Sequence, residues 1–290
     1  MTSSPDPALP GVPPAHERPF TRADVAAAGT SRSRFERLLR DGVVERVLLG
    51  VYAGAHAPRS AAFRAEAVRL AQRSDDAVAT GRTAAWVHGV DVAAFARPGA
   101  PPVPTSRRRR VRPARDVVRL HGLALTTPLR TLLDLARHDE AEVALAAADH
   151  LLAAGVVSRR ALLATLASTP DGAARAVLAQ ADGRARGAAE SVLRLHWHAS
   201  ALPTPVPGLV VPGRRAAVRL ALGVPDRRFG ALLGSACGGP DAAADDVARV
   251  REAGWWLVEV PDAAVLGRQP GQVRRHLERE FHQALLREVG

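Results

Sequence analysis

The stretch FTRADVAAAGTSRSRFERLLRDGVVERVLLGVYAG, residues Phe20–Gly54, decides the fold of the N-terminal part of the chain. Thr21 is placed to cap a first helix that Gly29 ends. Ser31 is placed to cap a second helix that Gly42 ends. Two short β-rich runs follow and meet at a Leu-Gly pair, which predicts a hairpin. The order helix, tight turn, helix, hairpin is typical of a winged helix-turn-helix.

The second of these helices has one apolar and one cationic face. Phe35, Leu38 and Leu39 follow the i, i+3, i+4 spacing of a core-facing stripe. A helix that enters the major groove of DNA needs hydrogen-bonding and cationic side chains near its N-terminal end. The predicted DNA-contacting residues are Arg32, Ser33, Arg34, Arg37 and Arg40 on this helix and Arg46 on the hairpin, which could reach a phosphate. A merely solvated, arginine-rich helix face is the open alternative.

Several segments of the chain resemble AbiEi-like antitoxins, the regulatory components of type IV toxin–antitoxin systems. The head segments are TRADV, GTSRSRFERLLRDG and GVYAG, within residues 18 to 54. Further on, TTPLRTLLDLAR (Thr126–Arg137) and AAADHLLAAGVVSRRAL (Ala146–Leu162) resemble the middle region of larger proteins that carry this head. The resemblance implies DNA binding and transcriptional repression, with a cognate toxin as a further partner.

Composition limits the classes of function. The 290 residues carry a formal charge of +11 and a pI of about 11.4, which favours a polyanionic partner, double-stranded DNA before a membrane surface. All forty basic residues are arginine, and the absence of lysine excludes a P-loop phosphate grip and a lysine Schiff base. The single cysteine cannot form an internal disulfide, and no apolar run is long enough for a membrane span. We expect a cytoplasmic protein without a cofactor.

Arginine is concentrated between residues 97 and 119, a window that carries one carboxylate, Asp116. Its eight arginines are Arg97, Arg107, Arg108, Arg109, Arg110, Arg112, Arg115 and Arg119. We expect an exposed loop in which Arg107, Arg108, Arg109 and Arg110 neutralise DNA phosphates, giving salt-sensitive binding that is indifferent to sequence. A loop that only increases solubility is the alternative.

Two helices are expected before this loop. The first, AAFRAEAVRLAQRS, places Phe63, Ala67, Leu70 and Ala71 on one side. The second, TGRTAAWVHGVD, is expected to be buried through Trp86, and His88 is interpreted as structural and not catalytic.

The C-terminal part has an α/β pattern. We expect a helix at 190–201, strands near 208–211, 216–222 and 228–234, a helix at 241–253, a strand at 255–260 and a helix at 272–289. Helix, three strands, helix, strand is also the core order of the PD-(D/E)XK restriction-endonuclease-like fold. The segments AAESVLRLHW, GVPDRRFG and VREAGWWLVEV resemble the very-short-patch-repair type of nuclease domain, which is often fused to this antitoxin-like head.

The carboxylates of that nuclease family are missing here. The resemblance implies an aspartate on the second strand and two acids on the third, yet these positions fall on Ala221 or Arg219, and on Leu232 and Gly234. Glu190 remains on the first helix, but one carboxylate does not assemble a magnesium site, so it is expected to contribute only a charge interaction at the helix N-terminus. We therefore predict no catalytic and no metal-binding residues. Misplaced acids at Asp241, Asp245 or Asp246 are the alternative.

Two further candidate sites are weaker. His196 and His198 lie two residues apart, so on a helix they point in opposite directions and do not share a metal, and a surface helix is expected there. Cys237 lies in a Gly-rich loop without an identifiable base. It is interpreted as an inert small residue.

Together these observations predict an α/β multidomain protein. A Pro-rich disordered tail is expected at 1–19, a winged helix-turn-helix at 20–57, an α+β antitoxin-like domain at 58–183 and a degenerate endonuclease-like domain at 184–290. The expected function is a DNA-binding regulator or antitoxin-like protein and not an enzyme. The alternatives are an endonuclease with a relocated metal site, or a non-catalytic partner of an active nuclease or a toxin. A homodimer stays open.

Overall fold

The computed structural model describes residues 18–72, 77–95, 113–212, 217–234, 240–267 and 270–289. The chain forms two compact units, Met1–His138 and Asp139–Gly290, each a mixture of helices and small sheets. The expected middle segment 58–183 contributes to both units. Three sequence-based expectations lie outside the described residues: most of the Pro-rich tail, the Arg107 to Arg110 cluster and Cys237.

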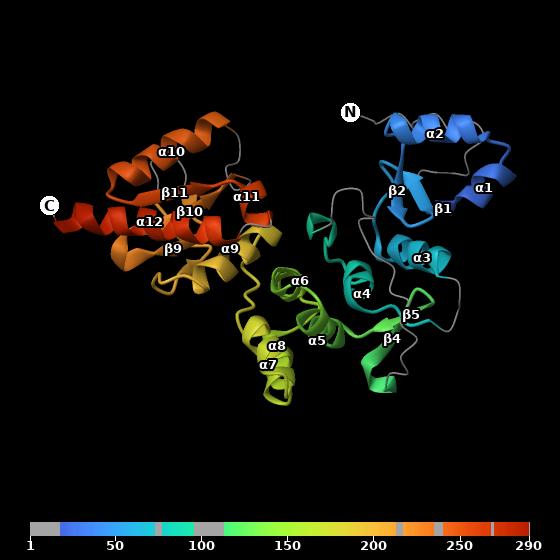
Figure 1. Ribbon diagram of the computed structural model, residues 1–290, viewed down its shortest axis with the longest axis horizontal. Helices are drawn as coiled ribbons and strands as arrows, with labels where there is room; N and C mark the ends of the chain where they lie inside the picture. Colours follow the sequence, from blue (N-terminus) through green and yellow to red (C-terminus); the bar gives the residue numbers. More distant parts are fainter. Residues whose placement is uncertain are drawn as a thin grey trace. The chain divides into compact units, whose positions relative to one another are not determined.

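The head of the first unit, residues 18 to 59, follows the expected order of elements (Figure 1). Strand β1 (Phe20–Thr21) leads into α1 (Arg22–Ala27), and α2 (Arg32–Arg40) precedes the hairpin of β2 (Val44–Leu48) and β3 (Val51–Gly54). The three strands form an antiparallel sheet in the order β1-β3-β2.

Side-chain caps fix where the two head helices begin. Thr21 and Asp24 form a reciprocal capping box at α1, and Ser31 Oγ accepts a hydrogen bond from the backbone N–H of Arg34 at α2. Gly29 and Gly42 follow the two helices with φ values of 75° and 69°, a left-handed conformation that favours glycine. The predicted starts and ends of both helices are confirmed.

The remainder of the first unit packs helices on a second hairpin. It contains α3 (Ala61–Ala71), α4 (Gly81–Val87), β4 (Val117–Leu120), β5 (Leu123–Thr126) and α5 (Pro128–His138). Short 3-10 turns lie at Ala93–Phe95 and Ala114–Asp116.

The burial of α3 and α4 agrees in part with the sequence-based expectation. Trp86 is buried as expected. The expectation for Leu70 is wrong: α3 packs on both the head sheet and α4, so its buried face centres on Ala67 and Val68. Leu70, in the last turn, is 40% exposed.

The second unit begins with four helices. These are α6 (Ala141–Ala153), α7 (Arg159–Ala167), α8 (Gly172–Leu178) and α9 (Ala188–His198). α9 lies against α6, α11 and α12, and its Trp197 is fully buried. The expected surface helix around His196 to His198 is therefore wrong, because this helix is covered on several sides.

A mixed sheet forms the centre of the second unit, in the order β11-β10-β9-β6. Its strands are β6 (Val206–Pro207), β9 (Leu222–Val224), β10 (Phe229–Leu233) and β11 (Trp256–Val260), and a separate pair is formed by β7 (Val210–Val211) and β8 (Val218–Arg219). β6 and β9 are antiparallel, as are β9 and β10, whereas β10 and β11 are parallel.

Three further helices complete this unit: α10 (Pro240–Glu252), α11 (Asp262–Leu266) and α12 (Pro270–Val289). α10 makes the crossover between the parallel strands β10 and β11. The aromatic rings of Trp197, Phe229 and Phe281 join α9, the sheet and α12. Among the described residues, no helix has the length and apolar character needed to cross a membrane.

Candidate nucleic-acid interface

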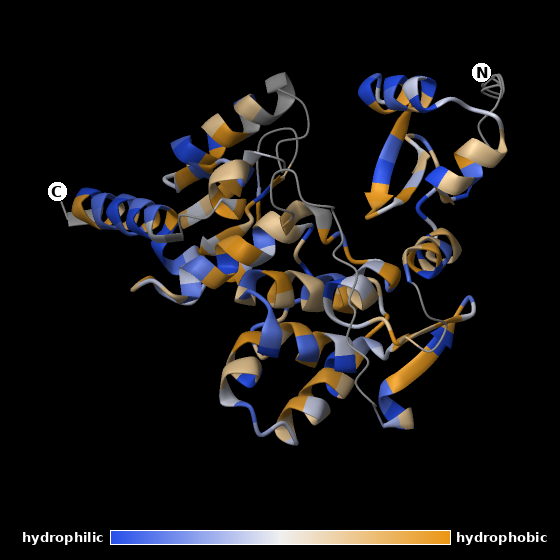
Figure 2. Ribbon diagram, turned by 45° about the vertical axis from the view of Figure 1, so that its right-hand side comes forward, coloured by the Kyte–Doolittle hydropathy of each residue, from blue (hydrophilic) through white to orange (hydrophobic). Residues whose placement is uncertain are grey.

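An aromatic cluster holds α2 on the head sheet. Phe35 is buried with Phe20, Val25, Val44 and Tyr52, and its ring meets that of Tyr52 edge-on at 5.0 Å between centroids. Because successive helix residues are turned by about 100°, the apolar face fixes which side chains point away from the core. In Figure 2 most of the α2 ribbon has the colour of hydrophilic residues, with hydrophobic residues at intervals along it.

Ser33, Arg37 and Arg40 lie nearly opposite Phe35 on the helix, at about 160°, 200° and 140° around its axis. Arg34 lies to one side of this face and Arg32 to the other. All five side chains are exposed, together with Arg46 on β2. The structure thus places Ser33, Arg37 and Arg40 on one solvent-facing side of α2, with Arg32 and Arg34 exposed at its two edges.

Arg22 organises the other side of α2. Its Nε donates a hydrogen bond to the Tyr52 hydroxyl at 3.0 Å, and its Nη2 donates to Glu36 at 2.8 Å. The guanidinium also lies over the rings of Phe35 and Tyr52. The hydrogen bonds to Tyr52 and Glu36 raise the pKa of Arg22. Glu36, the one carboxylate within α2, is therefore paired with Arg22.

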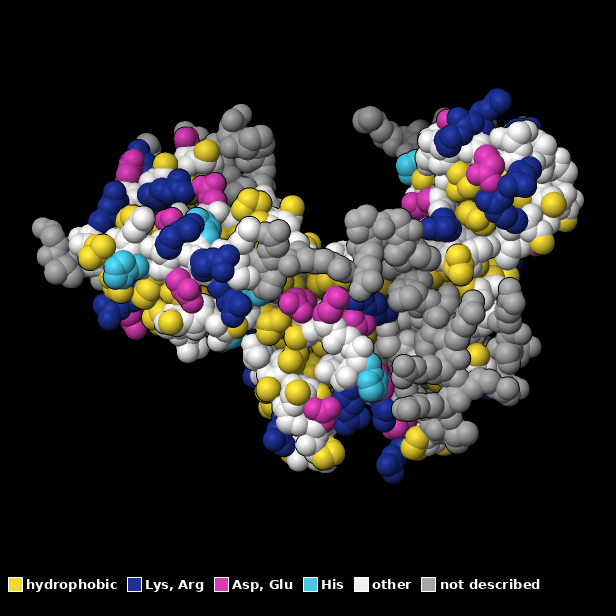
Figure 3. Space-filling model, viewed as in Figure 1, with side chains coloured by type: hydrophobic (Ala, Val, Ile, Leu, Met, Phe, Trp, Pro, Cys, Tyr) yellow, Lys and Arg dark blue, Asp and Glu magenta, His cyan; other side chains and the backbone are white. Residues whose placement is uncertain are grey.

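The other head carboxylates are mostly engaged as well. Asp24 caps α1, and Glu45 on β2 forms an ion pair with Arg59. Asp41, the C-cap residue of α2, takes part in the cap through its backbone N–H, and its carboxylate forms no ion pair with a described residue. By contrast, none of the predicted contact arginines, Arg32, Arg34, Arg37, Arg40 and Arg46, forms an ion pair or side-chain hydrogen bond with a described residue. Figure 3 shows cationic side chains gathered over this part of the molecule.

The hairpin that follows α2 exposes an apolar tip. Gly50 adopts a left-handed conformation with φ of 78° between β2 and β3, and the neighbouring Leu49 is 56% exposed. Arg46 lies on β2, three residues before Leu49. The hairpin therefore combines one unpaired cation and one exposed apolar side chain, the two kinds of group that wings use against DNA backbone and grooves.

The second candidate site lies in the C-terminal unit, around α9 and β8, where the nuclease resemblance implies catalytic acids. Arg219, on β8, donates from Nη1 and Nη2 to the two carboxylate oxygens of Glu190, at 2.5 and 2.9 Å. Glu190, in the first turn of α9, also accepts the backbone N–H of Arg186 at 3.0 Å. Its side chain is 8% exposed and that of Arg219 is 15% exposed. The expectation that Glu190 contributes only a helix-end charge interaction is therefore wrong.

A glycine makes room for this pair. Gly208 has φ of 63°, and a Cβ there would lie 2.9 Å from Nη2 of Arg219. The same Nη2 donates to the carbonyl of Arg184 at 2.8 Å. The guanidinium group of Arg219 thus donates to both the Glu190 carboxylate and the Arg184 carbonyl. The sequence alone did not indicate the contact between Arg219 and Glu190.

The other positions that the nuclease resemblance assigns to acids are apolar or lack a side chain. Ala221 and Leu232 are buried, and Leu232 pairs with Glu259 across β10 and β11. Gly234 follows β10. Of the alternative acids, Asp245 is exposed on α10, and the side chains of Asp241 and Asp246 lie outside the described part of the structure. In that described part, no three His, Cys, Asp or Glu side chains are grouped so that they could hold a metal.

The histidines considered in the sequence occupy structural positions. His88 Nε2 lies 2.8 Å from the carbonyl oxygen of Thr126, and burial lowers its pKa. Burial also lowers the pKa of His196, which is buried, whereas His198 is exposed on the opposite side of α9. The prediction that the last two imidazoles diverge agrees with this arrangement.

A buried polar network in the second unit was missed by sequence reasoning. Arg194 Nη2 on α9 contacts both carboxylate oxygens of Asp149 on α6, at 2.8 and 2.6 Å, and both side chains are 2% exposed. Asp149 also accepts from the Ser191 hydroxyl and the Asp182 backbone N–H, each at 2.6 Å. These contacts fix α6, α9 and the segment between them.

Comparisons with protein-family models, with curated proteins and with solved structures found no match for this chain. The likeness to AbiEi-like antitoxins and to very-short-patch-repair nucleases therefore stays a prediction from sequence motifs.

Proposed function

We propose that this chain is a sequence-specific DNA-binding regulator in which α2 is the recognition helix and the β2–β3 hairpin is the wing. In this role it would resemble AbiEi-like antitoxins, with double-stranded DNA as its partner. Ser33, Arg37 and Arg40 face the floor of the major groove, Arg32 and Arg34 its walls, and Arg46 a phosphate.

One observation carries this proposal: the arginines of the outer α2 face and the wing are exposed and without described carboxylate partners, while Arg22 and Arg59 of the same head are paired. Unpaired guanidinium groups on one surface repel each other, and a polyanion relieves that repulsion. A merely solvated helix face would gain from surface ion pairs with the available carboxylates. Here Glu36 and Glu45 are directed to Arg22 and Arg59 instead.

We propose further that the C-terminal domain is an endonuclease-like core without catalytic activity. The sheet order β6-β9-β10-β11, with one helix before it and one crossover helix before its last strand, supports this assignment. Hydrolysis of a phosphodiester in such a core relies on carboxylates that hold a divalent metal. The bidentate pair of Arg219 and Glu190 instead satisfies the one acid that remains.

The DNA-binding proposal is tested by an unbiased selection of duplex DNA with the purified full chain. Enrichment of a defined motif is expected. The selection is repeated with Arg34→Ala and Arg37→Ala, and with Arg69→Ala as a matched control, because Arg69 is an exposed arginine on α3. Loss of the motif in the α2 variants and its retention in the control would support the proposal. A selection without enrichment, or with equal loss in all three variants, would contradict it.

A further inference from the structure

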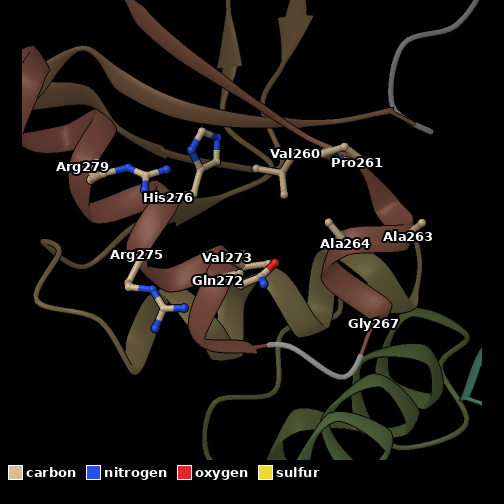
Figure 4. Close-up of a pocket in the computed structure, with 10 residues that line it drawn as sticks. All are labelled: Val260, Pro261, Ala263, Ala264, Gly267, Gln272, Val273, Arg275, His276 and Arg279. Atoms are coloured by element: carbon tan, nitrogen blue, oxygen red, sulfur yellow. The ribbon is translucent and has the colours of Figure 1, made fainter.

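A cleft in the second unit lies between the end of β11, α11 and the first half of α12. Its volume is about 560 Å³, within the range of small-molecule sites in proteins. In Figure 4, Arg275, His276 and Arg279 project from α12 on one side of the opening, and Val260, Ala263 and Ala264 lie on the other. We call it the α12 cleft.

The α12 cleft contains two arginines that form no ion pair with the described part of the chain. Arg275 and Arg279 are one helical turn apart, both are exposed, and neither forms an ion pair with a described residue. The carboxylates beside them on α12 have other partners: Glu278 accepts the backbone N–H of Ala201, and Glu280 accepts the indole N–H of Trp256 with one oxygen and lies 3.9 Å from Nδ1 of His276 with the other. Two guanidinium groups at i, i+4 spacing can grip the oxygens of one phosphate.

The opposite wall of the cleft is apolar. Val260, Ala263, Ala264 and Val273 contribute aliphatic surface, and His276 contributes an imidazole ring between this wall and the arginines. Gln272 lies at the same opening and offers both a donor and an acceptor. An aliphatic wall with a nearby ring suits a flat heteroaromatic group, and an amide suits the hydrogen-bonding edge of such a group.

We propose that the α12 cleft binds a nucleotide, with its phosphate on Arg275 and Arg279 and its base between His276 and the apolar wall. Inorganic phosphate alone would leave most of the cleft unfilled. The nucleotide could be free or could belong to a nucleic-acid strand, because both present the same phosphate and base. This inference does not rest on the proposed function of the head, since it involves only residues 260 to 279.

The test is calorimetric titration of the full chain with three kinds of probe. The probes are the four 5′-ribonucleoside monophosphates, inorganic phosphate and a short single-stranded oligodeoxynucleotide. The R275Q/R279Q variant removes the two cations. The R249Q/R251Q variant removes the same charge from two exposed positions on α10 and is the matched control. The A264L variant fills the apolar wall at an exposed position.

At least one monophosphate is expected to bind, and R275Q/R279Q should weaken its binding about tenfold or more, as expected for loss of charge-assisted hydrogen bonds. The control should bind like the unmodified chain. A264L should weaken nucleotide binding and leave phosphate binding unchanged. Binding of the oligonucleotide alone, with the same dependence on Arg275 and Arg279, would support the site and assign the nucleotide to a strand.

Three results would overturn the proposal. They are binding of neither nucleotide nor oligonucleotide at about 10 mM, equal losses in R275Q/R279Q and the control, and inorganic phosphate bound as tightly as the nucleotides. Selection of duplex DNA through α2 would be unaffected by any of these results, so failure here is distinct from failure of the proposed function.

Discussion

Arg219 and Glu190, 29 positions apart in the chain, form a two-point ion pair that ties β8 to the first turn of α9. Both side chains are mostly buried, and each satisfies the charge of the other. The guanidinium fork suits a carboxylate better than an ammonium group does, and it cannot lose its proton near neutral pH. The pair therefore holds β8 against the start of α9 through two hydrogen bonds.

Breaking this pair should destabilise the chain. Glu190→Ala leaves the Arg219 charge without its carboxylate, and we expect a loss of about 3 kcal/mol in the free energy of unfolding, measured by urea denaturation. Replacement of both partners, Glu190→Leu with Arg219→Met, should cost less than either single change, because no charge stays buried. A double variant at least as unstable as the sum of the single variants would contradict this account.

The chain should not cleave nucleic acid. Supercoiled plasmid, single strands and mismatched duplex, incubated with the purified protein in magnesium or manganese, are expected to stay intact, because no carboxylate cluster is found in the described residues. Glu190→Ala serves as the matched comparison. Metal-dependent nicking by the unmodified chain would contradict the prediction. Its loss in the variant, under conditions in which urea denaturation shows the variant to be folded, would show that Glu190 belongs to an active site.

The α2 face should read sequence. Arg37→Ala is expected to weaken binding to the selected duplex by about 1 to 3 kcal/mol and to weaken binding to random duplex less, because a base contact is lost only on the preferred site. Competition titrations at one fixed salt concentration measure both affinities. Equal losses on the two duplexes would limit Arg37 to phosphate contacts.

The cluster Arg107 to Arg110 should act on phosphates. Replacement of these four arginines by glutamine is expected to make the plot of log affinity against log salt concentration less steep, by an amount that corresponds to up to about four phosphate contacts. The preferred DNA motif should be retained. Binding is measured between low and moderate salt. If the slope did not change, these arginines would have to serve solubility or a protein partner.

Acid should destabilise both units through one partly buried and one buried histidine. Burial lowers the pKa of His88 in the first unit and of His196 in the second. The imidazoles take up protons more readily in the unfolded chain than in the folded one. The free energy of unfolding is therefore undiminished by these groups above about pH 6.5 and decreases as the pH falls below it. Urea denaturation at pH 7 and pH 5 should show this loss, and His196→Asn should reduce it. An unchanged pH dependence in that variant would assign the effect to other groups.

Local signals in the sequence predicted the head well. Thr21, Ser31, Gly29 and Gly42 act on their immediate neighbours, so caps and stops could be read without knowledge of the fold. The periodicity around Phe35 likewise separated the buried from the exposed face of α2. The C-terminal order of helix, strands, crossover helix and last strand was predicted from the alternation of apolar runs with helical segments. The expected strands near 208–211 and 216–222 are wrong in detail, because the structure has the shorter strands β6, β7, β8 and β9 in this region.

Contacts between distant segments could not be read in the same way. Nothing near Arg194 indicates that its charge is buried, because its partner Asp149 lies 45 positions earlier on another helix. The His196 to His198 segment was placed at the surface because its two imidazoles diverge, whereas its burial comes from the packing of α9 against α6, α11 and α12. Arg22 gave no signal either, although its contact with Tyr52 determines how Glu36 is oriented.

The aromatic cluster of the head has a spectroscopic consequence. Tyr52 is the single tyrosine of the chain, and it touches both Phe35 beneath α2 and the guanidinium of Arg22. All four tryptophans, Trp86, Trp197, Trp255 and Trp256, lie outside the head. Isotope labelling of tyrosine alone would therefore give one set of ring resonances that belongs to the head, and a ligand seated on α2 would shift it.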